Sequence, residues 1–138
     1  MRLLKDDLAE FPLFSQASRS ELAVIRRHLT PLQISAGRVL VREGDRGDQF
    51  MIIAEGSATV TQGGQTIATL GAGDLVGEMA LLEHDGFGRR NATVTVTTDA
   101  VVYVGSRAEF RGILDAAPSV ARKVRETAAS RTVMPLAA

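Results

Sequence analysis

The residues best suited to chemistry in this chain lie in one short segment, Gly77-Glu78-Met79-Ala80-Leu81-Leu82, followed by Arg90-Asn91-Ala92-Thr93. The first part has the pattern of a short helix on a loop between strands. A helix N-terminus offers unpaired N–H groups and the positive end of the helix dipole, and Arg90 adds a planar fork of donors that matches a phosphate. Glu78 has the wrong charge for a phosphate, but a carboxylate can accept hydrogen bonds from sugar hydroxyls. Phosphate and sugar recognition within one loop predicts a nucleotide site.

Four further helices are expected, two at each end of the chain. Their apolar residues recur at helical spacing, and two helices begin with a capping box, in which a serine and a glutamate three positions later bond each other's amide groups. Prolines end the first two helices and suit the first turn of the last one. The expected helices cover about residues 3–11, 18–30, 106–114 and 118–131, with capping boxes at Ser18/Glu21 and Ser106/Glu109.

Short β-rich segments fill the middle of the chain. They alternate with glycine-marked turns, and Gly63-Gly64 predicts a hairpin because glycine takes positive φ readily. The expected strands cover residues 39–41, 50–54, 57–62, 65–70, 93–98 and 101–104. This order predicts a mainly β fold with flanking helices (α+β), with an antiparallel β-roll or jelly-roll barrel at about residues 32–105. The nucleotide segment interrupts this roll.

Composition limits the function classes. The 138 residues fit a single domain (1–138), and 45% hydrophobic residues suffice for a core. Sixteen basic and sixteen acidic residues cancel, which disfavours nucleic-acid binding by this chain. No apolar run approaches the ~20 residues that span a bilayer, and the N-terminus has no secretory signal. We therefore expect the protein to be cytoplasmic. We also expect that this chain alone does not attach to a membrane.

The residue pattern gives no support for catalysis or metal binding. The sequence contains no cysteine, and His28 and His84 are too far apart to make a persuasive metal site. A cupin, which has a similar barrel, would need a clustered set of His and Glu ligands. No nucleophile–base pair stands out, so we expect neither an enzyme nor a cofactor. Asp45 and Asp48 are interpreted as residues that stabilise turns.

Two motifs together resemble the cyclic nucleotide-binding domain family of bacterial channels, protein kinase A regulatory subunits and catabolite activator proteins. The residues from Gly77 to Thr93 look like this family's phosphate-binding cassette, which includes a short helix. Upstream, the segment from Arg42 to Gly56 resembles its glycine-marked strand-turn-strand. The resemblance covers about residues 11–131 and implies a β-roll that binds cAMP, or possibly cGMP.

The resemblance also implies roles for individual residues. Arg90 would pair with the cyclic phosphate, together with the backbone N–H of Ala80 and with Asn91. Glu78, next to Gly77, would accept a hydrogen bond from the ribose 2′-OH. Contacts to the pocket and the base would come from Met79, Leu81, Ala92, Thr93 and, as a lid on the last helix, Arg131.

The sequence departs from the family pattern in three places. Glu78 and Arg90 lie twelve positions apart, about three more than usual, with the extra residues at 84–88. Such a loop insertion is thermodynamically cheap. Arg89 stands where the family usually has proline, and it competes with Arg90 for the phosphate role. Asn91 stands where the family has Ala, Ser or Thr; a hydroxyl there is associated with cGMP, so the base preference stays open.

The leading hypothesis is a regulatory sensor domain that binds a cyclic nucleotide, with cAMP as the first candidate. Its flanking helices would move on binding and act on an effector domain or partner protein, such as a channel, a transporter or an enzyme. Two alternatives remain open. One is a fragment of a cAMP-responsive transcription regulator, whose helix-turn-helix would follow the last helix. The other is a vestigial β-roll that serves protein interaction or dimerisation and binds no nucleotide.

Overall fold

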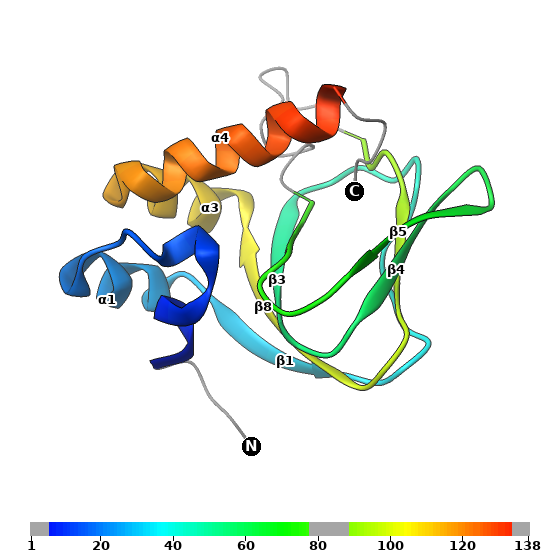
Figure 1. The fold of residues 1–138 in the computed structure, drawn as a ribbon, viewed down its shortest axis with the longest axis horizontal. Coiled ribbons are helices and arrows are strands. Elements are labelled where there is room, and N and C mark those ends of the chain that lie inside the picture. Colours follow the sequence, from blue (N-terminus) through cyan, green and yellow to red (C-terminus); the bar gives the residue numbers. More distant parts are fainter. Residues whose placement is uncertain (1–5, 78–88, 134–138) are drawn as a thin grey trace.

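A computed structural model of the chain describes residues 6–77 and 89–133 (Figure 1). Two four-stranded antiparallel sheets form a roll, with strand orders β1-β8-β3-β6 and β2-β7-β4-β5. The strands are β1 (Thr30–Ile34), β2 (Val39–Val41), β3 (Gln49–Glu55), β4 (Ala58–Gln62), β5 (Gln65–Leu70), β6 (Leu75–Val76), β7 (Thr93–Val96) and β8 (Ala100–Ser106). The helices are η1 (Asp6–Glu10), η2 (Pro12–Phe14), α1 (Arg19–Arg27), α3 (Arg107–Ala116) and α4 (Pro118–Val133). The expected α+β roll with two C-terminal helices is confirmed, and the expected cassette helix lies outside the described residues.

The N-terminal segment differs from the expectation of two α-helices. Within the described residues, two short 3-10 helices, η1 and η2, replace the helix expected at residues 3–11. Leu8, Phe11 and Phe14 are all buried and lie three positions apart, the period at which 3-10 side chains line up. Pro12 stands at the start of η2, where its missing N–H prevents an α-helix from continuing. Among residues 6–29, a single α-helix, α1, therefore precedes the roll.

Both predicted capping boxes are present. The Glu21 amide donates to Ser18 Oγ at 3.1 Å, and the Ser18 amide donates to Glu21 Oε1 at 2.7 Å. The same reciprocal pair joins Ser106 and Glu109, with distances of 3.1 and 2.8 Å. These caps start α1 and α3 at defined residues, so α3 begins directly where β8 ends.

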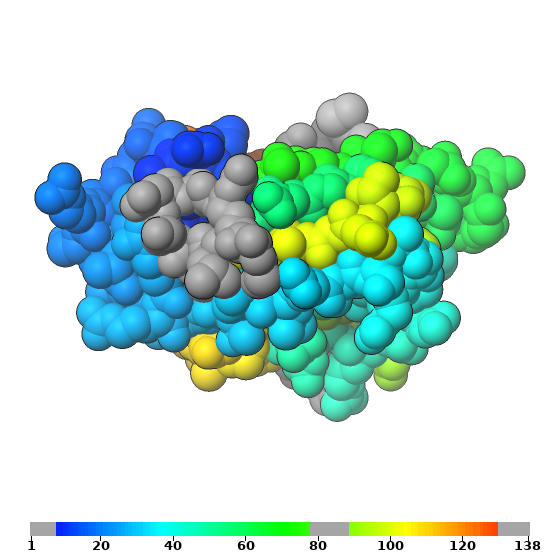
Figure 2. Space-filling view, turned by 90° about the horizontal axis from the view of Figure 1, so that it is seen from below, coloured from blue at the N-terminus to red at the C-terminus, as the bar shows by residue number. Residues whose placement is uncertain are grey.

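The predicted Gly63-Gly64 hairpin joins β4 to β5, and both glycines have positive φ, +58° and +82°. Two strands were not expected from the sequence. β1 contains Pro31, which a sheet tolerates at its edge because the outer side of an edge strand makes no ladder bonds. β6 has only two residues, which pair with β3. In the view from below, the β4–β5 hairpin projects at the end of the molecule away from the N-terminal helices (Figure 2).

The strand β3 separates two hydrophobic clusters. Phe50 and Ile52 point into a cluster shared with the helices, whereas Met51 and Ile53 point into the interior of the roll. This alternation follows from the two-residue period of a strand. The helix-side cluster also contains buried residues of the N-terminal segment, β8, α3 and α4, among them Phe14, Tyr103, Phe110, Val120 and Val124. The helices therefore pack on one face of β3, and the hydrophobic interior of the roll lies on its other face.

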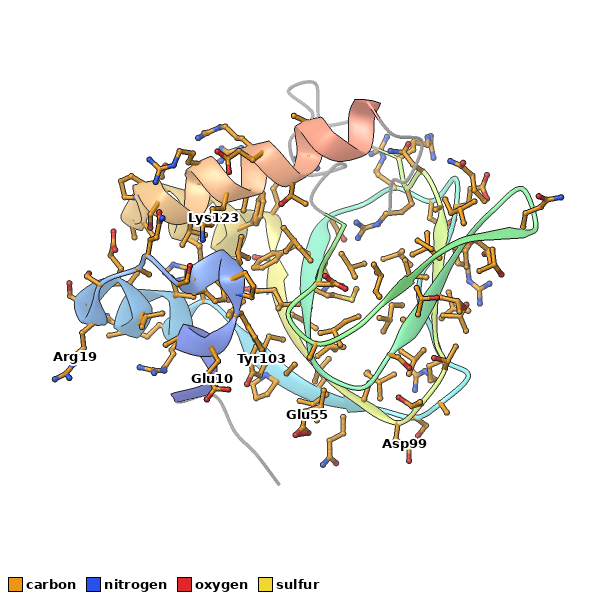
Figure 3. The ribbon with its side chains drawn as sticks, in the orientation of Figure 1. Glu10, Arg19, Glu55, Asp99, Tyr103 and Lys123 are labelled. Atoms are coloured by element: carbon orange, nitrogen blue, oxygen red, sulfur yellow. The ribbon has the colours of Figure 1, made fainter. Side chains whose placement is uncertain are left out.

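Apolar and polar contacts together hold α4 in place. Val120 and Val124 are almost fully buried, as their spacing predicts. Lys123 points from α4 toward the N-terminal helices (Figure 3), and its Nζ donates to Pro12 O at 2.6 Å and to Ser15 Oγ at 2.7 Å. The first half of α4 is thus fixed to η2. No helix among residues 6–77 and 89–133 is long and apolar enough to cross a membrane.

Candidate functional site

Arg90 is a buried cation at the end of the roll, just before β7. Its side chain is 7% exposed. Nη1 donates to Gly77 O at 3.1 Å and Nη2 donates to Gln49 O at 2.8 Å. The backbone is also paired, because Arg90 N donates to Asp45 O at 2.7 Å and Gly44 N donates to Arg90 O at 2.9 Å. Two main-chain carbonyls therefore hold the guanidinium, and the turn at residues 44–45 holds the Arg90 backbone.

Gly77 is the residue at which the predicted cassette begins, and the structure places it against Arg90. Its φ is +91°, a conformation that residues with a side chain rarely adopt. A Cβ atom here would collide with Nη1 of Arg90 and lie 2.9 Å from Gln49 O. A glycine at position 77 is thus what allows the guanidinium to approach the chain this closely.

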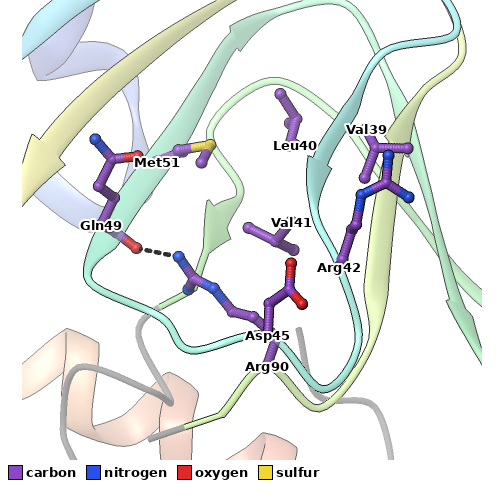
Figure 4. Close-up of a pocket in the computed structure, with 8 residues that line it drawn as sticks. All are labelled: Val39, Leu40, Val41, Arg42, Asp45, Gln49, Met51 and Arg90. Carbon is purple, nitrogen blue, oxygen red and sulfur yellow. Dashed lines mark hydrogen bonds between the residues drawn. The ribbon is translucent and has the colours of Figure 1, made fainter. Parts of the chain in front are cut away.

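Arg90 lines a cavity of about 180 Å³ between β2, the following turn and the start of β3 (Figure 4). Apolar side chains of β2 and β3 surround it together with charged side chains, and most of the surface open to the cavity is polar. The described residues that line it are Val39, Leu40, Val41, Arg42, Asp45, Gln49, Met51 and Arg90. A cavity with a mostly polar surface beside a fixed guanidinium can receive an anionic group.

The other residues predicted for the site lie in different surroundings. Asn91 is exposed, and its backbone carbonyl oxygen accepts a hydrogen bond from Gln62 Nε2 at 2.9 Å. Ala92 is fully buried in the interior of the roll. Thr93 Oγ1 accepts a hydrogen bond from Glu43 N at 2.9 Å. Glu78, Met79, Ala80 and Leu81 lie outside the described residues, as does the side chain of Arg131.

The two neighbouring arginines that compete for the phosphate role occupy different positions. Arg89 is exposed, and its Nη1 donates to Gly44 O at 3.2 Å. It pairs through its backbone with Arg46, on the turn after β2. Arg89 is absent from the described cavity lining, whereas Arg90 is part of it. The structure thus brings together Gly77 and Arg90 from the predicted set.

Sequence reasoning missed the residues that β2 and its turn contribute to the cavity, among them Arg42 and Asp45. The signal available was the motif that begins at Arg42, but a register irregularity between Val39 and Val41 hides which side chains point inward. Asp45 was interpreted as a turn-stabilising residue. Within the described part of the chain its carboxylate makes no hydrogen bond, and its backbone closes the turn instead, through Asp45 N to Arg42 O at 3.1 Å. The described residues contain no His, Asp or Glu cluster that could hold a metal ion.

Comparison with known proteins agrees with this geometry. The sequence pattern of the family described as the cyclic nucleotide-binding domain matches residues 31–117, which is more than half of the chain. The chain belongs to the cyclic nucleotide-binding domain family. The match includes the roll from Pro31 onward, with Gly77 and Arg90.

Several relatives of this domain are much longer proteins. A cyclic nucleotide-gated potassium channel of Rhizobium etli is 36% identical over 124 residues, which cover 90% of this chain and 34% of the channel. This chain therefore spans about a third of that relative. A solved regulatory domain of Toxoplasma gondii protein kinase A, crystallised with cAMP, has a TM-score of 0.78 at 25% identity, covering 90% of this chain and 48% of that one.

A further solved structure shows that this fold does not fix the ligand. It is the regulatory subunit of a cAMP-independent protein kinase A from Trypanosoma brucei, and it also has a TM-score of 0.78 at 25% identity. The match covers 87% of this chain and 42% of that one. The same roll thus occurs in a protein described by its independence from cAMP, and the ligand must be argued from the residues of the site.

Proposed function

We propose that this chain is a regulatory sensor domain that binds a cyclic nucleotide, with cAMP as the first candidate. The observation that carries the proposal is the buried Arg90 guanidinium, held by Gly77 O and Gln49 O at the wall of the cavity. A cation fixed in advance can pair with an anionic ligand without losing side-chain freedom on binding. Its fork of N–H donors suits the oxygens of a cyclic phosphate.

The cassette residues would complete the site. Because Gly77 contacts Arg90, the segment that follows Gly77 starts beside the guanidinium. We assign the Ala80 amide and Asn91 to the phosphate, and Glu78 to the ribose 2′-OH. The base would contact Met79, Leu81, Ala92, Thr93 and Arg131.

The output would be a change in the helices that flank the roll. β3 begins at Gln49, whose carbonyl holds Arg90, and its next residue Phe50 packs on Phe110 of α3 with ring centroids 4.8 Å apart. A ligand that binds Arg90 would therefore affect β3, the strand against which α3 packs. The effector is proposed by analogy: the Rhizobium relative is a channel, and a transporter or enzyme would suit the same domain.

A thermal-shift measurement with cAMP and cGMP tests the proposal. A ligand present at 100 times its Kd adds about 2.7 kcal/mol to the free energy of unfolding, so a binding domain melts several degrees higher. The Arg90→Ala variant, compared with its own melting temperature without ligand, should lose this shift. A wild-type protein that shows no shift with either nucleotide would favour the vestigial interaction module instead.

A further inference from the structure

Asp45 and Arg90 are joined through their backbones, and both line the cavity. The two residues exchange backbone contacts, since Arg90 N donates to Asp45 O at 2.7 Å and the neighbouring Gly44 N donates to Arg90 O at 2.9 Å. Both side chains line the same cavity. In Figure 4 the Asp45 carboxylate lies, in projection, between the side chains of Arg90 and Arg42. An anionic group is therefore held beside the place where Arg90 would receive its ligand.

The Asp45 side chain is exposed and takes no part in the hydrogen bonds of its turn. Within the described residues it accepts no hydrogen bond and forms no ion pair, and the turn is closed by the backbone of Asp45 instead. The described lining contains two cations, Arg42 and Arg90, and this one anion. Charges of both signs therefore line the described part of the cavity.

We infer that Asp45 is a specificity residue that discriminates against ligands whose phosphate carries two negative charges. The inference deepens the proposed function and rests on it. A cyclic phosphodiester has one negative charge. A nucleoside 5′-monophosphate has close to two at pH 8, because the second ionisation of a phosphomonoester has a pKa of about 6. The second charge of the monophosphate would lie in the same cavity as the Asp45 carboxylate.

Repulsion of this size is enough to select a ligand. Two like charges several Å apart at a protein surface repel by an amount that changes binding on the order of tenfold. The attraction of Arg90 favours every phosphate, and a repulsive group is one way to separate one anion from another. Asp45 supplies that group. Its repulsion depends on the charge of the ligand and not on the shape of the sugar–phosphate ring.

The test compares three ligands with the whole chain at pH 8: cAMP, 5′-AMP, and the 5′-AMP methyl ester. The methyl ester is linear like 5′-AMP but carries one charge like cAMP. Calorimetry on Asp45→Asn should show the preference for cAMP over 5′-AMP reduced about tenfold, while the ratio of cAMP to the methyl ester changes less than twofold. Asp115→Asn, which removes the same charge from an exposed position on α3, should leave both ratios unchanged.

The outcomes separate this inference from the proposed function. If wild type binds cAMP and Asp45→Asn leaves the ratio of cAMP to 5′-AMP within twofold, Asp45 is not a charge filter, although the domain is a cyclic nucleotide sensor. If Asp45→Asn changes the ratios for 5′-AMP and the methyl ester equally, the residue acts on shape, and the inference is also wrong. If wild type binds neither cAMP nor cGMP, both proposals are wrong.

Discussion

A side chain at position 77 and the guanidinium of Arg90 cannot occupy their places together. Gly77 adopts φ +91°, its carbonyl oxygen accepts a hydrogen bond from Nη1 of Arg90, and a Cβ atom at this position would collide with the same nitrogen. The two residues are thirteen positions apart in sequence. The cassette therefore starts with a glycine for a reason of space as well as of backbone conformation.

Replacing Gly77 by alanine should both destabilise the domain and displace Arg90. We expect the free energy of unfolding to fall by about 2 kcal/mol, because the residue would keep a left-handed conformation and meet a buried side chain. Urea unfolding measures this change. Gly71→Ala is the matched control, since Gly71 has no positive φ and a Cβ there meets nothing within 4 Å. Equal stability of the two variants would show that the contact with Arg90 is unimportant.

Arg90→Ala should weaken cyclic nucleotide binding by on the order of 2–5 kcal/mol, because the ligand's charge would lose its partner in the cavity. Arg90→Lys keeps the charge but not the planar fork, and should recover only part of this loss. Isothermal calorimetry gives both values. Arg89→Ala is the control from the exposed neighbour and should bind within twofold of wild type. If Arg90→Ala binds cyclic nucleotide like wild type and Arg89→Ala binds it much more weakly, the phosphate role belongs to Arg89.

Glu78 should make the site prefer ribose over 2′-deoxyribose. This prediction comes from the sequence, because Glu78 lies outside the described residues. Wild type should bind cAMP more tightly than 2′-deoxy-cAMP, since the deoxy ligand leaves the carboxylate without its donor. Glu78→Gln keeps an acceptor and should lose less affinity for cAMP than Glu78→Ala. Equal affinities of wild type for the two ligands would remove Glu78 from the ribose role.

Lys123→Met should loosen α4 from the N-terminal helices. Nζ makes short hydrogen bonds to Pro12 O and Ser15 Oγ, so we expect a loss of about 1 kcal/mol in the free energy of unfolding. Chemical denaturation measures the loss. Arg125→Met removes a charge from the exposed face of the same helix and should be close to neutral. If both variants unfold like wild type, the polar contacts of Lys123 do not hold the helix.

Cyclic nucleotide binding should slow amide exchange in α4 more than in the roll. The helix buries a narrow row of small side chains, Val120, Val124 and Ala128, so its docking has limited stability without ligand. Its first half is fixed to η2 through Lys123, and the gain should therefore be largest after residue 125. Hydrogen exchange with and without cAMP measures it. Protection confined to the cassette would mean that α4 does not carry the signal.

The sequence determined the local elements, because local chemistry fixes them. A serine and a glutamate three positions apart start α1 and α3, and two adjacent glycines close the β4–β5 hairpin. The same reasoning was wrong for the N-terminal segment: apolar residues three apart fit an α-helix or a 3-10 helix, and the packing of Phe11 and Phe14 in the core decides between them. β1 and β6 were not expected from the sequence. A proline-containing edge strand and a two-residue strand have little intrinsic preference for β structure, and pairing with neighbouring strands stabilises them.

For the candidate site, too, the sequence predicted one part and the tertiary structure decided the other. Motif and charge were sufficient to single out Gly77 and the pair Arg89–Arg90, because a glycine-led segment followed by an arginine is recognisable without a fold. The choice between Arg89 and Arg90 is one of burial, and only the tertiary structure has one guanidinium exposed and the other enclosed by Gly77 O and Gln49 O. The place of Asp45 likewise depends on a backbone pairing between residues 45 positions apart in sequence, since Arg90 N donates to Asp45 O at 2.7 Å. Pairing at this distance is set by strand register, and register is decided by which side chains the whole roll can bury.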